Sequence, residues 1–295
     1  MTAIRIVTTA RAERQRAFTI VELLVAISIL TLIVLVLYGL FDQTQRALRS
    51  NVAQIDVHEG GRAGMELLSR EMEQMQAGNA LTNVNLFTRF TATPSRQTLL
   101  NPGEERTNLL EEVYFLSLLN KDWIGTGYRV LAMNTNGIAV GFAKAGVGTL
   151  CRFSTNNHVA NVRNPSLYSR VMDDTPANLA NYQRVIDGVV HFCARAYDST
   201  GALITNNFNP NILSGVLVGA NVFNNDVEYS YAFTNRALPA YVEIELAVLE
   251  PHVLERFKSY PTPTPSSFVA ASNYLARQAG AVHLFRQRVP IRMAK

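Results

Sequence analysis

Apolar and polar residues follow different patterns along the chain, and the first of these is a long apolar run. From Leu23 to Phe41, nineteen consecutive residues carry no charge. At about 1.5 Å per residue, a helix of this length nearly crosses a hydrocarbon core of about 30 Å. A secretory signal peptide has a shorter apolar core, of roughly 7–15 residues, followed by a small-x-small cleavage site. Neither feature occurs before Asp42, so the run predicts a membrane-spanning helix that is retained.

Beyond the span, apolar residues recur at steps of three and four, which indicates one face of a helix that continues to Gly78. This face contains Leu48, Val52, Ile55, Met65, Leu68, Met72 and Met75. We expect it to pack under a sheet as ordinary core. Gly60, Gly61 and Gly64 each weaken a helix by about 1 kcal/mol relative to alanine, so we expect a bend or local unwinding near Gly60.

From residue 79 onward the pattern changes to the alternation of β-strands. The predicted strands are 112–119, 127–134, 137–142, 149–154, 185–198, 227–234, 240–249 and 281–291, with a short helix at 267–278. In 240–249, Val242 and Ile244 alternate with Glu243 and Glu245, which predicts one buried face and one face in water. The fold class expected is α+β, with a long N-terminal helix packed on a mainly antiparallel sheet.

Charge is concentrated at the N-terminus. The formal net charge is +4, and Arg5, Arg11, Arg14 and Arg16 against Glu13 place +3 of it in the first 17 residues, which leaves 4 − 3 = +1 for the rest. Such a nearly neutral remainder argues against nucleic-acid binding. By the positive-inside rule, the arginines place the N-terminus in the cytoplasm and the residues after about 42 outside the inner membrane.

Glu22 stands one residue before the uncharged run, where an acidic group costs up to roughly 2.5–3.5 kcal/mol if it moves toward the bilayer centre. Its surroundings, RQRAFTIVELLVAISIL, resemble the type IV prepilin motif: a basic leader, a small residue, an aromatic residue, and a glutamate four positions later. The alternative is an ordinary single-span anchor in which Glu22 reaches the interface.

The resemblance implies processing and assembly. A prepilin peptidase would cut between Ala17 and Phe18 and methylate the new amine of Phe18, although glycine is usual where this chain has Ala17. Glu22 would then pair with the α-amine of Phe18 in a neighbouring subunit, a buried pair that sets register more than it adds stability. The chain would consist of a leader (1–17), a transmembrane half-helix (18–41), an amphipathic half-helix (42–78) and a β-rich periplasmic head (79–295).

The head shows a looser resemblance to the J-type minor pseudopilin of type II secretion and to the W-type minor pilin. It rests on GRAGMELLSREMEQMQAG (61–78), VIDGVVHFCARAYDSTG (185–201) and LPAYVEIELAVLEP (238–251). The partners this implies are other pseudopilins or pilins, with I- and K-type subunits at a filament tip, together with prepilin peptidase and the inner membrane.

Motifs of chemistry are absent from the sequence. The five histidines are far apart with no HExxH pair, and no GxSxG, GxxxxGK[ST] or complete GxGxxG occurs, so we expect no enzyme activity, metal, cofactor or small-molecule substrate. Asp173 and Asp174 could contribute to a calcium site, but a solvated loop is the stronger interpretation.

Two cysteines leave two alternatives. Cys151 and Cys193 each fall in a predicted strand. An exported domain would meet oxidising conditions, in which a bridge between them could add roughly 3–4 kcal/mol. Otherwise they are two buried thiols that act as small apolar residues.

Three functions follow. The leading one is a non-catalytic minor pseudopilin of a type II secretion pseudopilus. The second is a minor pilin of a surface type IV pilus, serving adhesion, motility or DNA uptake. The third, a membrane-tethered periplasmic enzyme, would need a cleft with converging titratable groups.

Overall fold

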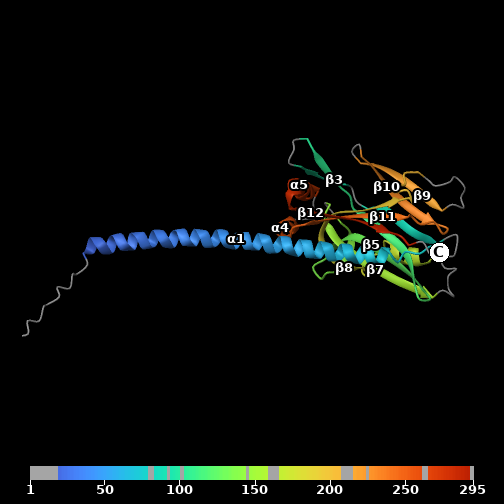
Figure 1. The fold of residues 1–295 in the computed structure, drawn as a ribbon, viewed down its shortest axis with the longest axis horizontal. Coiled ribbons are helices and arrows are strands. Elements are labelled where there is room, and N and C mark those ends of the chain that lie inside the picture. The colour runs from blue at the N-terminus through green and yellow to red at the C-terminus, as the bar shows by residue number, and fades with distance from the viewer. Residues whose placement is uncertain are drawn as a thin grey trace, which may run out of the picture. The chain divides into compact units, whose positions relative to one another are not determined.

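The computed structural model describes residues 19–78, 83–91, 94–99, 103–143, 146–158, 166–206, 215–223, 226–260 and 265–292 (Figure 1). The chain divides into two compact units, Met1–Val52 and Ala53–Lys295. We call the first the anchor unit and the second the sheet unit, and we describe each by itself. Helix α1 (Ile20–Met72) begins in the anchor unit and ends in the sheet unit.

A ten-stranded sheet forms the body of the sheet unit, and all of its paired strands are antiparallel. The order is β12-β11-β8-β7-β5-β4-β1-β10-β9, with β6 paired to β5. The strands are β1 (Val84–Phe90), β4 (Glu111–Leu119), β5 (Asp122–Met133), β6 (Ala139–Phe142), β7 (Gly148–His158), β8 (Gln183–Tyr197), β9 (Val216–Phe223), β10 (Asp226–Thr234), β11 (Tyr241–Leu249) and β12 (Val282–Pro290). A long helix followed by an antiparallel sheet confirms the predicted α+β class.

Shorter elements complete the sheet unit. Strands β2 (Ser95–Thr98) and β3 (Glu105–Asn108) form a separate hairpin. The helices are α2 (Ser166–Met172), α3 (Pro176–Leu179), α4 (Pro251–Lys258) and α5 (Pro265–Ala276), with a 3-10 turn η2 (Ala279–Ala281). Helices α4 and α5 pack together and bury Val253 and Leu275 in one cluster with Ala247 and Leu249 of β11.

The main core lies between the last turns of α1 and one face of the sheet. It contains Met65, Leu68, Met72 and Met75, at most 4% exposed, as the periodic stripe predicts. The burial begins only at Val57, whereas Leu48, Val52 and Ile55 are exposed. The apolar face of the amphipathic half-helix is therefore core over its second part alone.

The glycines of α1 do not unwind it. The helix continues without a break through Gly60, Gly61 and Gly64, so the expected local unwinding is wrong. A Cβ at Gly61 would collide with the ring of Phe285, and one at Gly64 would collide with the side chain of Ile186. Glycine at these two positions lets the helix backbone approach the sheet closely, which offsets its low helix propensity.

The helix also ends earlier than predicted, at Met72 rather than Gly78. After a turn, Met75 forms a bridge with Ser117 of β4, and the Gln76 N–H donates to the Leu116 carbonyl at 2.9 Å. The chain leaves the helix because its backbone pairs with the sheet.

The expected wet face of β11 is also wrong. Val242, Ile244, Leu246 and Val248 are buried in the main core as predicted. Glu245, on the opposite face, is only 5% exposed. Glu245 is buried because the side chains of His191, Arg195 and Arg286 contact its carboxylate.

Candidate membrane-assembly site

Thr19 and Glu22 close the N-terminus of α1. The Thr19 N–H and hydroxyl both donate to Glu22 Oε2, at 2.9 and 3.0 Å, and the Glu22 N–H donates to Thr19 Oγ1 at 3.3 Å. This reciprocal arrangement is a capping box, which satisfies backbone N–H groups that a helix start leaves without an intrahelical acceptor. Sequence reasoning missed Thr19, although the Thr-x-x-Glu spacing just before an apolar run is the signal for such a cap.

The apolar residues that follow form the anchor. Every large apolar side chain from Ile20 to Phe41 is exposed in the described chain, from 47% at Ile33 to 85% at Ile20. Within the described residues, α1 is the one helix long and apolar enough to cross a membrane, and its most apolar 18-residue window has a mean hydropathy of 3.0. A single apolar N-terminal helix fits single-pass anchoring.

The two hydroxyls inside the span are satisfied by the helix itself. Ser28 Oγ donates to the Leu24 carbonyl and Thr31 Oγ1 to the Ile27 carbonyl, both at 2.8 Å. Side chains that bond their own preceding turn present no unpaired donor to lipid. The polar residues of the span are therefore compatible with a hydrocarbon surrounding.

The proposed cleavage position, Ala17 and Phe18, lies outside the described residues. Glu22 lies inside them, and its carboxylate accepts from Thr19 of the same chain. Its predicted partner, the amine of a neighbouring Phe18, belongs to another subunit and stays a prediction.

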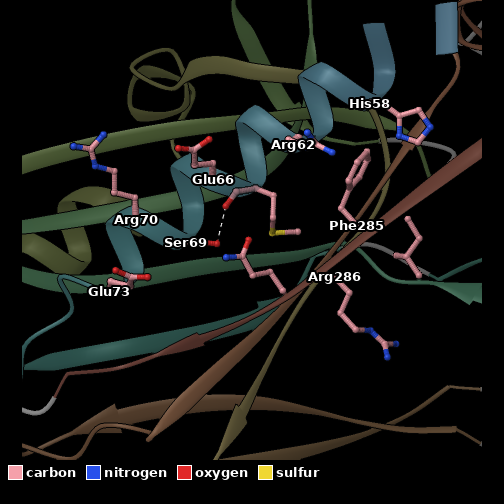
Figure 2. A pocket seen from close by; sticks show the side chains of 11 residues that line it. His58, Arg62, Glu66, Ser69, Arg70, Glu73, Phe285 and Arg286 are labelled. Atoms are coloured by element: carbon pink, nitrogen blue, oxygen red, sulfur yellow. Dashed lines mark hydrogen bonds between the residues drawn. The ribbon is translucent and has the colours of Figure 1, made fainter. Parts of the chain in front are cut away.

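In the sheet unit, a groove of about 590 Å³ runs between α1 and β12. Figure 2 shows charged side chains along the α1 side, and on β12 it shows Phe285 pointing toward the helix and Arg286 pointing away from it. The groove residues of α1 are His58, Arg62, Met65, Glu66, Ser69, Arg70 and Glu73. Ser69 Oγ donates to the Met65 carbonyl at 2.8 Å, so this hydroxyl is held by the helix rather than poised as a nucleophile.

A second group of charges lies on the face of the sheet opposite the main core. The Leu109 N–H donates to His191 Nδ1 at 3.0 Å, so His191 carries its proton on Nε2, which faces Glu245 Oε2 at 3.2 Å. Burial lowers the pKa of His191. Burial alone would raise the pKa of Glu245, but the hydrogen bond from His191 and the charge of Arg195 outweigh it and lower this pKa to about 2. A neutral histidine and an ionised glutamate result.

The aspartates considered for calcium are engaged by protein groups. Asp173 accepts from the Thr175 N–H at 3.1 Å and from its hydroxyl at 2.9 Å. Asp174 forms ion pairs with Arg129, which is fully buried, and with Arg89. The described residues contain no group of three or more His, Cys, Asp or Glu arranged to hold a metal ion.

The two cysteines are free and buried, so the bridging alternative is wrong for this structure. Cys151 lies opposite Arg184 on β8, and Cys193 lies farther along β8, opposite Glu245 of β11. Nine residues of strand separate positions 184 and 193, roughly 25–30 Å, whereas a disulfide needs Cα atoms within about 7 Å. Burial raises the pKa of both thiols, to about 12 for Cys151.

Comparison with known proteins gives one match. Residues 13–38 match the family described as the prokaryotic N-terminal methylation motif. A search of curated proteins and a search of solved structures found no match. The matched segment contains the predicted cleavage position, Glu22 and most of the apolar span. Together with a long helix that precedes an antiparallel sheet, the motif indicates a membrane-anchored subunit of the type IV pilin-like kind.

Proposed function

We propose that the chain is a non-catalytic minor pseudopilin, which assembles into or primes a periplasmic type II secretion pseudopilus. The observation that carries the proposal is Glu22, a carboxylate at the start of an exposed apolar helix and inside the matched motif. An exposed apolar helix needs lipid or other helices around it, and both are available to a subunit that leaves the membrane for a filament. The sequence resemblance of the head to J-type subunits supports the secretion system.

Processing is tested by the mass of the N-terminus. The full-length gene is expressed in cells with and without prepilin peptidase, and the purified chain is analysed by mass spectrometry. We expect a chain that begins with methylated Phe18 in the first case and with the leader in the second. A chain that keeps its leader in the peptidase-positive cells would contradict the proposal.

The role of Glu22 in assembly is tested by two substitutions. Glu22→Gln keeps an oxygen that can accept from Thr19, so it retains the cap but loses the charge, whereas Glu22→Ala loses both. If the carboxylate pairs with a neighbouring amine, both variants insert in the membrane and both enter filaments poorly, because a buried amine is left unpaired. If Glu22→Gln assembles normally and Glu22→Ala does not, the cap is the important function and the intersubunit pair is refuted.

The alternative is a minor pilin of a surface type IV pilus, since the motif is common to both systems. Deletion of the gene separates them. Loss of protein secretion with normal surface pili supports the pseudopilin, and loss of pili, motility or DNA uptake with normal secretion supports the pilin. An enzyme is disfavoured because pilin-like proteins are structural, and accumulation of an unchanged substrate in the deletion strain would revive that hypothesis.

A further inference from the structure

A small cavity opens on the face of the sheet opposite the main core. Its volume is about 200 Å³, and its charged lining consists of Arg106, His191, Arg195, Glu228, Glu245 and Arg286. These residues come from β3, β8, β10, β11 and β12, which are far apart in the sequence. Leu284 is 46% exposed and the side chain of Arg286 is 58% exposed, so the cavity is open to solvent on the β12 side.

Two of the three arginines, Arg195 and Arg286, form ion pairs with the glutamates of the cavity. Arg195 binds Glu228 through two parallel bonds, Nε to Oε2 at 3.0 Å and Nη2 to Oε1 at 2.6 Å, and its Nη1 lies 2.8 Å from Glu245 Oε1. Arg286 forms an ion pair with Glu245 as well. The remaining Glu245 oxygen accepts from His191 at 3.2 Å. Glu228 and Glu245 are therefore both already in ion pairs with Arg195 or Arg286.

Arg106 is the third arginine, and it has no carboxylate of its own. Among the described residues, none of the ion pairs within 4.0 Å includes its guanidinium, although it is half-buried and feels the charge of Glu245. Because the Leu109 N–H binds Nδ1, His191 is neutral. The cavity thus holds three positive and two negative side chains, an excess of +1.

An excess charge in a half-buried place is costly unless an anion compensates it. A guanidinium presents N–H groups in a planar fork that matches the two oxygens of a carboxylate, and the pair of Arg195 with Glu228 shows this geometry in the same cavity. From the surplus guanidinium and the open cavity we infer that Arg106 and Arg286 bind a carboxylate group from outside the chain. The carboxylate comes either from an acidic side chain of a partner protein or from a small free acid.

The inference is independent of the pseudopilin proposal, since it rests on the sheet unit alone. It is tested on the full chain in detergent micelles by following the arginine Nε–H signals in NMR spectra during a titration with sodium acetate, with sodium chloride at equal ionic strength as the reference. We expect acetate to shift, saturably, the signal that disappears in Arg106→Gln. In that variant acetate should bind at least tenfold more weakly, as judged by the Arg286 signal.

Arg96→Gln is the matched control. Arg96 lies on the partner strand of the same hairpin, is 53% exposed and pairs with Glu105, so its removal changes the net charge equally without touching the cavity. Acetate binding should be unchanged in this variant. Equal weakening by both variants, or no saturable shift in the wild-type chain whose near-UV circular dichroism shows it folded, would overturn the site.

Two peptides distinguish the sources of the carboxylate. Acetyl-Ala-Glu-Ala-amide carries the carboxylate on a peptide side chain, and the Gln version removes only the charge. Tighter binding of the Glu peptide than of acetate, with no binding of the Gln peptide, identifies a protein side chain as the ligand. Saturable acetate binding with exclusion of both peptides identifies a small free acid.

Discussion

Two buried glutamates of the sheet unit have pKa values that are shifted in opposite directions. Glu245 is surrounded by Arg195, Arg286 and His191, and its pKa is lowered to about 2. Glu111 is fully buried, and although the Ala194 N–H donates to it at 2.7 Å, burial raises its pKa to about 8. At neutral pH the first is ionised and the second carries a proton. The difference arises because cations reach only Glu245.

The protonated state of Glu111 predicts a fall in stability as pH rises. In the unfolded chain its pKa is about 4.3, so between about pH 4.3 and pH 8 the folded state binds the extra proton, and unfolding becomes easier by up to about 1.4 kcal/mol per pH unit. Glu111→Gln cannot ionise and should flatten this slope. Chemical denaturation of the full chain in detergent at pH 5 and pH 8 measures it. Equal slopes in the variant and the wild-type chain would contradict the prediction.

Glu245 predicts the opposite dependence in acid. Because its folded pKa is depressed, its contribution is present above the unfolded pKa of about 4.3 and is lost as pH falls toward 2. Glu245→Gln should therefore lower stability at pH 7 by several kcal/mol, since it leaves Arg195 and Arg286 with fewer partners, and by much less at pH 2. Denaturation at the two pH values gives the comparison. A loss of equal size at both would show that packing, not charge, is what the substitution disturbs.

At the scale of the element, the glycines of α1 decide how closely the helix approaches the sheet. Gly60 faces open space, while the neighbouring Gly61 faces the Phe285 ring and Gly64 faces Ile186. A methyl group at Gly60 meets nothing. At the other two positions it meets side chains that must move.

Gly60→Ala and Gly61→Ala therefore form a matched pair. The first should stabilise the chain by about 0.5–1 kcal/mol, because alanine favours the helix. The second gains the same propensity but displaces Phe285, and overpacking of this kind costs about 1–3 kcal/mol. Denaturation midpoints of the two variants test the difference. If both are stabilised equally, the close approach at Gly61 has no energetic consequence.

Regular alternation of apolar and polar residues predicted most strands of the sheet unit, and apolar residues at helical spacing predicted the part of α1 that packs on the sheet. All eight predicted strand segments overlap strands of the sheet, and the helix predicted at 267–278 overlaps α5. Strands β1 and β9 were missed because neither alternates apolar and polar residues regularly: VNLFTRF has polar residues on both faces, and VLVGANVF is an apolar run interrupted by Gly219 and Asn221. Helix α4 was missed although Pro251 at its start and the spacing of Val253, Leu254 and Phe257 could have indicated it.

What the sequence could not supply is the pairing of distant segments. Local patterns do not show that β1 lies between β4 and β10, where Thr88 Oγ1 accepts from the Tyr231 N–H at 3.0 Å. For the same reason Glu245 was expected in water. Its neighbours Arg195 and Arg286 come from strands on either side of β11, and Arg106 of β3 lines the same cavity. The motif around Glu22 was predictable because it is contiguous.

At the scale of the whole molecule, the sequence and the two units predict one orientation. Four arginines precede the span, whereas the flank after it mixes Asp42 with Arg46 and Arg49, and Asp42 and Arg46 form an ion pair at 2.7 Å, so more positive charge lies on the N-terminal side. The sheet unit should therefore be periplasmic. Alkaline phosphatase fused after Lys295 folds only in the periplasm and should be active, while green fluorescent protein fused at the same place and exported unfolded should be dark.

The four arginines before the span provide the control for this predicted orientation. Replacing Arg5, Arg11, Arg14 and Arg16 by alanine removes the excess of positive charge before the span without changing the length or hydropathy of the span. If charge sets the orientation, a fraction of the phosphatase fusion should become inactive, and adding lysines after Asp42 in the same variant should increase that fraction. A fully active fusion in both variants would mean that something other than flanking charge, such as recognition of the prepilin motif itself, directs the sheet unit outward.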